Sequence, residues 1–138
     1  MKKKYVLELG TLDVLADDII KNFADGVVIL RGDLAAGKTT LVKKITQKLA
    51  CNDEVTSPTF SLQQCYGDKI FHYDIYNHGL EYFISLGMLE ELEKEGLHFI
   101  EWGNDELVEI LHSAGMNIMT IDITKISQKA REYTICTH

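Results

Sequence analysis

Gly32-Asp33-Leu34-Ala35-Ala36-Gly37-Lys38-Thr39-Thr40 is the stretch that decides the fold. It fits the phosphate-binding loop pattern, in which a glycine and four residues precede Gly-Lys-Ser/Thr. The apolar run Val27–Leu30 before it predicts a buried strand, and apolar residues at 41, 42, 45 and 49 after it follow helical spacing. Phosphate binding requires this order of strand, loop and helix, because backbone N–H groups at a helix N-terminus attract phosphate oxygens.

The loop pattern also assigns roles to its side chains. Lys38 is expected to reach the β- and γ-phosphates of a nucleotide, and the hydroxyl of Thr39 is expected to bind Mg²⁺. The expected nucleotide-binding residues of the loop are Leu34, Ala35, Ala36, Gly37, Lys38, Thr39 and Thr40.

The length of 138 residues predicts one domain over residues 1–138, and the strand, loop and helix around the phosphate-binding pattern predict an α/β fold. The net charge of −7 argues against tight binding of nucleic acid by this chain alone, because such binding depends on Lys and Arg neutralising phosphates. The apolar runs are too short to cross a bilayer, and no apolar segment follows the lysines at 2–4. We therefore expect a cytoplasmic protein without a membrane partner. The three cysteines are odd in number and lack metal-ligand spacing, which favours reduced thiols.

The remaining segments predict alternating strands and helices. A strand at 5–9 precedes an amphipathic helix that starts at Thr11, with Thr11 as its N-cap. Two β-like runs, 60–66 and 69–76, predict a hairpin around Gly67-Asp68. A helical region at 80–95 is interrupted near Gly87 and ended by Gly96. A strand at 97–100, a short helix at 104–112 and strands at 117–126 and 132–136 complete the chain.

Two carboxylates stand at the ends of predicted strands. Asp74 lies near the end of the second hairpin arm, on the same face as His72, and Glu101 follows the apolar run 97–100. A carboxylate in this position is what a Mg²⁺ site opposite a phosphate loop needs. Between the loop and the hairpin, Thr59 follows Pro58, where a segment that senses the γ-phosphate commonly lies.

The chain resembles the bacterial TsaE (YjeE) family, the ATPase of tRNA threonylcarbamoyladenosine biosynthesis. The resemblance rests on the loop at 32–40 and on three further islands: Ser-Pro-Thr-Phe-Ser-Leu at 57–62, His-Tyr-Asp-Ile-Tyr at 72–76 and Glu-Trp at 101–102. It implies a P-loop NTPase-like fold with a mixed central sheet flanked by helices, ATP and Mg²⁺ as cofactors, and slow ATP hydrolysis. It also implies action on the TsaB–TsaD threonylcarbamoyl transferase complex, contact with tRNA only through that complex, and an isolated chain that is monomeric or self-associates weakly.

The resemblance implies roles for individual residues as well. The catalytic set is Asp74, Glu101 and Lys38, the metal set is Thr39, Glu101 and Asp74, and the nucleotide-binding set adds Thr11 and Thr59 to the loop. Three positions depart from the family pattern. Ala35 and Gly103 replace a common glycine and a common proline, and Asn77 replaces an arginine near the site. We expect Arg31, Arg131, a lysine or a partner residue to supply that missing cation.

Other readings of a phosphate loop remain open. A small-molecule or nucleotide kinase usually carries several arginines that clamp a second substrate, and this chain has only two. A GTPase needs an Asn-Lys-x-Asp segment, which is absent. A nucleotide-gated binding module with incidental hydrolysis fits the same residues as the ATPase.

Overall fold

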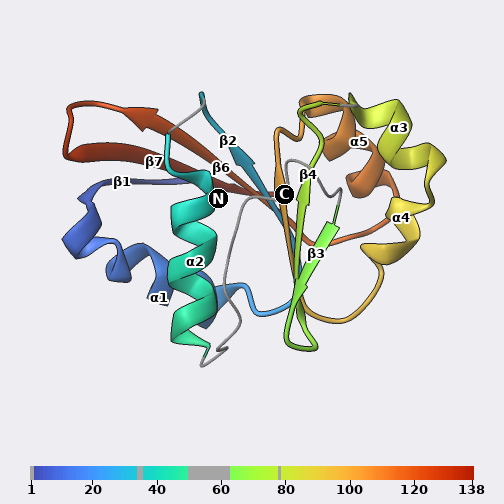
Figure 1. Ribbon diagram of the computed structural model, residues 1–138, viewed down its shortest axis with the longest axis horizontal. Helices are drawn as coiled ribbons and strands as arrows, with labels where there is room; N and C mark the ends of the chain where they lie inside the picture. Colours follow the sequence, from blue (N-terminus) through green and yellow to red (C-terminus); the bar gives the residue numbers. More distant parts are fainter. Residues whose placement is uncertain (1, 34–35, 50–62, 78) are drawn as a thin grey trace.

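The computed structural model describes residues 2–33, 36–49, 63–77 and 79–138. Seven strands form one mixed sheet in the order β1-β7-β6-β2-β5-β4-β3 (Figure 1). The strands are β1 (Lys2–Glu8), β2 (Gly26–Arg31), β3 (Gln63–Tyr66), β4 (Ile70–Asp74), β5 (Leu97–Glu101), β6 (Ile118–Lys125) and β7 (Ala130–Thr137). The helices are η1 (Leu9–Thr11, a 3₁₀ turn), α1 (Asp13–Asn22), α2 (Lys38–Lys48), α3 (Gly79–Ser85), α4 (Met88–Glu91) and α5 (Asp105–Ser113).

The centre of the sheet is parallel and its margins are antiparallel. β2 pairs in parallel with β5 and β6, and β4 pairs in parallel with β5. β7 runs antiparallel to both β1 and β6, and β3 runs antiparallel to β4. Parallel strands with helices on both faces are buried on both sides, which explains the apolar run Val27–Leu30 of β2 and the burial of every residue of β5. The expected α/β fold with a mixed sheet flanked by helices is confirmed.

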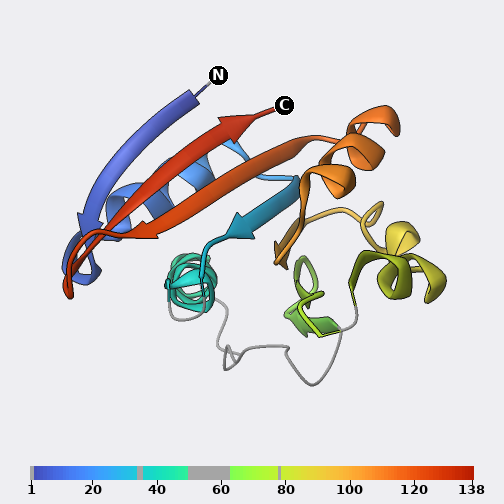
Figure 2. The same cartoon turned by 90° about the horizontal axis from the view of Figure 1, so that it is seen from above.

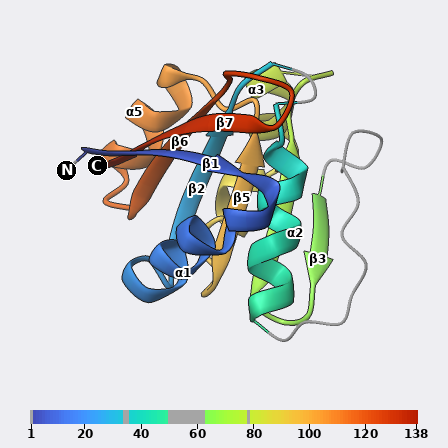
Figure 3. The same cartoon turned by 90° about the vertical axis from the view of Figure 1, so that its left-hand side faces the viewer.

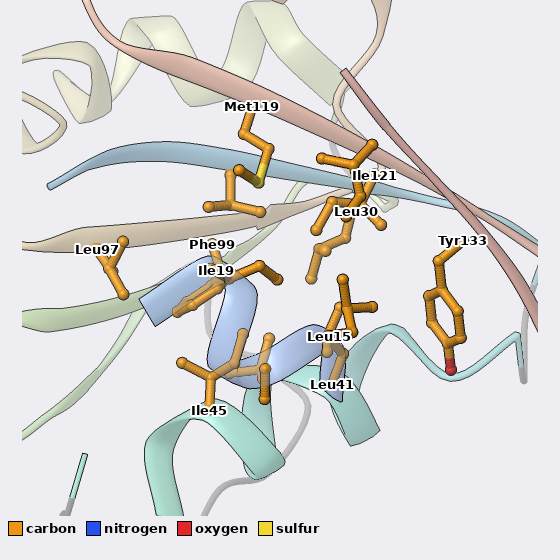
Figure 4. Close-up of a cluster of buried hydrophobic side chains, with 14 of the residues drawn as sticks. Leu15, Ile19, Leu30, Leu41, Ile45, Leu97, Phe99, Met119, Ile121 and Tyr133 are labelled. Carbon is orange, nitrogen blue, oxygen red and sulfur yellow. The ribbon is translucent and has the colours of Figure 1, made fainter. Parts of the chain in front are cut away.

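Each face of the sheet has its own hydrophobic core. Val28 and Leu30 of β2 face α1 and α2, whereas Val27 and Ile29 face the layer formed by α3, α4 and α5. Figures 2 and 3 show these helix layers on opposite sides of the strands. In the first core, Leu15 and Ile19 of α1 and Leu41 and Ile45 of α2 meet side chains of β2, β5, β6 and β7 (Figure 4). Leu41, Val42 and Ile45 of the apolar stripe predicted after the loop thus form the buried face of α2, whereas Leu49 follows the helix and is 41% exposed.

The register of the central strands aligns their carboxyl ends. Leu30 of β2 and Asp74 of β4 both stand opposite Glu101 of β5. In open α/β sheets this edge is where ligands bind. The sheet therefore places both predicted carboxylates at the edge from which the phosphate loop departs.

Several predicted boundaries are wrong in detail. β1 begins at Lys2 instead of at residue 5, because an edge strand accommodates lysines whose ammonium groups reach Asp18 and Glu132. The helix predicted from Thr11 begins at Asp13, and Thr11 ends the 3₁₀ turn before it. The hairpin turn spans three residues, 67–69, because Tyr66 pairs with Ile70. The predicted interruption near Gly87 is confirmed, since Gly87 has a left-handed φ of 77° between α3 and α4.

None of the helices in the described part of the chain has the length and apolar character that a membrane crossing requires. Cys65 and Cys136 are free thiols, and Cys51 lies outside the described residues.

Candidate functional site

The phosphate loop leaves the end of β2 and leads into α2. Gly32 has a φ of 153°, and a Cβ placed there would lie 2.7 Å from the carbonyl oxygen of Ile123 and 3.0 Å from the Cβ of Ala36. Gly37, the residue before α2, has a φ of 108° and no described atom within 4 Å of an added Cβ. One glycine is thus needed for packing against β6, whereas the other borders open space at the helix N-terminus. Leu34 and Ala35 lie outside the described residues.

Lys38 is the first residue of α2 and is almost completely buried, with 5% of its surface exposed. Its ammonium donates to the carbonyl oxygens of Gly32, at 2.6 Å, and of Asp33, at 3.1 Å. Burial lowers the pKa of Lys38, and the nearby carboxylates of Glu101, Asp74 and Asp33 oppose this effect. The side chain is therefore folded back onto its own loop, beside both predicted carboxylates.

Thr39 and Glu101 meet across the base of the loop. The hydroxyl of Thr39 donates to Oε2 of Glu101 at 2.9 Å. Glu101 is 4% exposed and ends β5, next to β2. A hydroxyl at the start of the helix and a carboxylate at the end of the neighbouring strand are thus in contact, although 62 positions separate them in the sequence.

Asp74 stands beside Glu101 on the adjacent strand. Its Oδ1 accepts a hydrogen bond of 2.8 Å from the backbone N–H of Tyr76, and 7% of the residue is exposed. The strands pair in parallel at Asp74 and Glu101, so both side chains project from the same face of the sheet. Two buried acidic groups therefore lie on the α2 face at the edge of the sheet.

His72 belongs to this site and was missed as a site residue in the sequence. The ring is fully buried, and its Nε2 lies 2.5 Å from Oε2 of Glu101. Its Nδ1 lies 3.0 Å from the hydroxyl of Tyr66, which in turn donates to Oε1 of Gln64 at 2.9 Å. Two signals were available: His72 stands two residues before Asp74 on the same strand face, and it opens the His-Tyr-Asp-Ile-Tyr island at 72–76.

Trp102 covers the ammonium of Lys38. The distance from Nζ to the centroid of its ring is 3.8 Å, which is a cation–π contact. The ring also packs against Tyr76, with centroids 4.6 Å apart. Trp102 has a φ of 71°, the only positive φ of a non-glycine residue in the described ranges. Such backbone strain is typical of functional sites.

A hollow of about 460 Å³ opens beside the loop on the side of β7. It is lined by Leu9 and Gly10 of the 3₁₀ turn, by Gly37 and Thr40, and by the turn residues before β7. Thr11 lies next to this lining, where its hydroxyl accepts from the N–H of Glu8 and donates to the carbonyl of Glu8. The N-cap role predicted for Thr11 is therefore wrong, because the hydroxyl closes the turn before α1.

The two arginines of the chain take different positions around the loop. Arg131 of β7 donates from Nε to the carbonyl oxygen of Ala36 at 3.1 Å. Arg31 points the other way, to the carbonyl of Gly103 and the carboxylate of Asp105. Among the described residues of the loop, Ala36 is thus held by Arg131, whereas the contacts of the Arg31 guanidinium lie outside the loop. Asn77 is exposed, and Thr59 lies outside the described residues.

The donor groups fit a phosphate ester with a hard cation. Hydroxyl and carboxylate oxygens are the ligands that Mg²⁺ prefers, and protein sites usually hold it by one or two carboxylates together with substrate phosphates. The described residues contain no cluster of three or more His, Cys, Asp or Glu side chains that could hold a metal ion by themselves. A cation here would depend on phosphate oxygens for the rest of its ligands.

Comparison with known proteins relates the chain to one family. The family model described as "Threonylcarbamoyl adenosine biosynthesis protein TsaE" matches residues 8–133. The chain is 36% identical over 112 residues to the tRNA threonylcarbamoyladenosine biosynthesis protein TsaE of Treponema pallidum, covering 79% of this chain and 80% of that protein. It is 36% identical over 101 residues to the protein of that name from Nostoc, covering 71% of this chain and 58% of the Nostoc protein. The chain thus spans less than two thirds of the length of some relatives.

The crystal structure of Bacillus subtilis YdiB is similar throughout, with a TM-score of 0.72 and 25% identity. The match covers 98% of this chain and 84% of YdiB. Since the family model matches all but the two ends of the sequence, the chain belongs to the TsaE family.

Proposed function

We propose that this chain is an ATPase domain over residues 1–138 that binds ATP with Mg²⁺ at the loop 32–40. In this proposal it hydrolyses ATP slowly and supports the formation of N⁶-threonylcarbamoyladenosine in tRNA by acting on the TsaB–TsaD transferase. The observation that carries the proposal is the 2.9 Å contact between the hydroxyl of Thr39 and the carboxylate of Glu101, next to Lys38. A generic glycine-rich turn would have no reason to unite these three groups.

Nucleotide binding would begin with the backbone amides of the loop and the N-terminus of α2. The N–H groups point at the phosphate oxygens, and the dipole of the helix favours their negative charge. The ammonium of Lys38 would exchange the carbonyl oxygens of Gly32 and Asp33 for phosphate oxygens, which are stronger acceptors because they are charged. The hollow of about 460 Å³ between the 3₁₀ turn and β7 is suited to the nucleoside, since it adjoins Gly37 and Thr40.

Three side chains at the loop would take part in ATP hydrolysis: Thr39, Glu101 and Asp74. The hydroxyl of Thr39 and the carboxylate of Glu101 are suited to hold the magnesium ion, which when bound neutralises charge on the β- and γ-phosphates. Asp74 is suited to orient the attacking water or a metal-bound water, because its carboxylate lies on the same sheet face as Glu101. Arg131 is the better of the two arginines to replace the cation lost at Asn77, since it already contacts Ala36 in the loop.

Support for the tRNA pathway comes from the relatives. The Treponema and Nostoc proteins are named for tRNA threonylcarbamoyladenosine biosynthesis. The net charge of −7 favours a role through a protein partner over direct tRNA binding. ATP bound at the loop would then control docking on the transferase.

Calorimetry with ATP and Mg²⁺ tests nucleotide binding. Lys38→Ala should abolish the heat of binding. Lys48→Ala is the matched control, because Lys48 lies on the same helix but pairs with Asp17 and Asp13 at its far end. An unaltered affinity in Lys38→Ala would overturn the proposal.

A pull-down with the transferase subunits, carried out with ATP, with ADP and without nucleotide, tests docking. A tRNA modification assay with Glu101→Ala and Asp74→Ala then separates the ATPase from a binding module. We expect modification to stop after the first rounds in both variants. Full modification in a variant that no longer hydrolyses ATP would instead favour the binding module.

A further inference from the structure

We propose that His72 is a positioning residue that fixes the Glu101 carboxylate for the magnesium ion, an inference that rests on the proposed function. The ring of His72 is fully buried in β4 and held at both nitrogens. Nε2 contacts Oε2 of Glu101 at 2.5 Å, and Nδ1 contacts the hydroxyl of Tyr66 at 3.0 Å. An imidazole held at both ends can neither flip nor tilt, so it defines the direction of its contact with Glu101.

The two carboxylate oxygens of Glu101 differ in their contacts with the protein. Oε2 is in hydrogen-bond contact with both the hydroxyl of Thr39 and Nε2 of His72. Oε1 makes no hydrogen bond to any residue that the structure describes. The carboxylate is thus anchored through one oxygen, and the other is left for a cation.

Removing the imidazole contact would loosen this arrangement. Glu101 is 4% exposed, so water cannot readily replace a lost partner of Oε2. A buried carboxylate with one hydrogen-bond partner removed turns toward another donor. This rotation takes Oε1 away from the position that a cation needs. Loss of a group that orients a metal ligand typically weakens metal affinity by about 10- to 100-fold.

His98 offers a matched control for this role. It is also a fully buried histidine of a central strand, with both ring nitrogens hydrogen-bonded. Its partners are the hydroxyl of Tyr73, at 2.8 Å, and the carbonyl oxygen of Lys94, at 2.7 Å. These partners lie on the opposite face of the sheet from Glu101, because Tyr73 belongs to the second core. A general effect of removing a buried histidine should therefore appear at both positions.

The test measures how strongly magnesium favours nucleotide binding. The dissociation constant of N-methylanthraniloyl-ATP is determined in EDTA and in excess Mg²⁺ for the native chain and for the variants. The ratio of the two constants is the coupling between metal and nucleotide. His72→Asn should lower this ratio by about 10-fold or more while the constant in EDTA stays within about 2-fold. His72→Gln, whose amide reaches further toward Glu101, should recover part of the ratio, and His98→Asn should leave it unchanged.

Three results would count against the inference. An unchanged ratio in His72→Asn overturns it, and so does an equal loss in His98→Asn, which would indicate a general effect on the fold. Absence of ATP binding by the native chain would instead refute the proposed function, and the inference with it. If His72→Asn does not fold, Tyr66→Phe removes the hydroxyl that holds Nδ1 and should lower the ratio by a smaller factor. An unchanged ratio in that variant also overturns the inference.

Discussion

The two glycines that bound the phosphate loop should respond in opposite ways to alanine. At Gly37, φ is 108° and ψ is 22°, and an added Cβ meets no described atom within 4 Å. Alanine there costs only backbone strain, about 1–2 kcal/mol, which lowers the melting temperature of a chain of this length by roughly 3–10 °C. The Gly37→Ala variant should therefore remain folded.

Nucleotide binding by Gly37→Ala should nevertheless be lost. The open space beside Gly37 lies at the N-terminus of α2, where a phosphate oxygen would approach the backbone amides. A methyl group there would block two hydrogen bonds to a charged acceptor, each of which contributes about 1.5–3 kcal/mol. The sum of about 3–6 kcal/mol corresponds to a loss in affinity of at least about 100-fold.

Gly32→Ala should damage the fold instead. The new Cβ would lie 2.7 Å from the carbonyl oxygen of Ile123 and 3.0 Å from the Cβ of Ala36. Backbone strain at a φ of 153° costs about 1–3 kcal/mol, and overpacking adds about 1–3 kcal/mol. The total of about 2–6 kcal/mol is a large part of the usual stability of a domain, so this variant should melt far below Gly37→Ala.

Circular dichroism melting curves and calorimetry with ATP and Mg²⁺ distinguish the two effects. A Gly37→Ala chain that is folded and binds ATP like the native chain would refute the assignment of this space to phosphate. A Gly32→Ala chain with native stability would refute the packing argument.

Three further predictions follow from other contacts. Trp102 is the only tryptophan of the chain and lies over the Lys38 ammonium, so its fluorescence emission should change when Lys38 moves to bind ATP with Mg²⁺. A constant emission at saturation would contradict this movement of Lys38. Burial lowers the pKa of His98, so the folded state binds fewer protons than the unfolded state. The free energy of unfolding should then be highest above the ordinary histidine pKa of about 6.5 and should decline as the pH falls through that value. Denaturant unfolding at several pH values measures this decline, which should be smaller in His98→Phe. Asn104 caps α5 by accepting from the N–H of Leu107 at 2.9 Å, so Asn104→Ala should cost about 1 kcal/mol in thermal unfolding and Asn104→Ser should restore most of it.

The sequence was most informative where a local pattern determines local structure. The strand before the loop, the helix after it and the hairpin all follow from apolar periodicity and turn residues. Asp74 and Glu101 could each be placed at the end of a strand, where a site opposite the phosphate loop needs a carboxylate. That the two lie side by side depends in addition on β4 and β5 being parallel neighbours, which the sequence did not predict.

Contacts between distant segments could not be predicted in this way. His72 and Glu101 are 29 positions apart, and their contact depends on which strands become neighbours and in what register. A single histidine in a buried run carries no signal for that partner. The same limit applies to Trp102, because its positive φ follows from the path of the chain after β5 and not from its residue type.

Thr11 shows a different limit. A threonine before an apolar helical stripe is a common N-cap, but here the chain first makes a 3₁₀ turn that uses the same hydroxyl. Both structures satisfy the local preference of threonine for backbone hydrogen bonds. The choice between them depends on how β1 enters the sheet.

The pairing of β1 with β7 has a consequence for how the chain matures on the ribosome. β1 (Lys2–Glu8) is translated before the other described strands, yet within the described structure its sheet partner is β7 (Ala130–Thr137), which is translated more than a hundred positions later. β1 must therefore emerge from the exit tunnel and wait for this partner strand while the segments between β1 and β7 are synthesised. The lysines at positions 2–4 would keep that waiting segment soluble, because charged side chains disfavour pairing with the edge strands of other nascent chains.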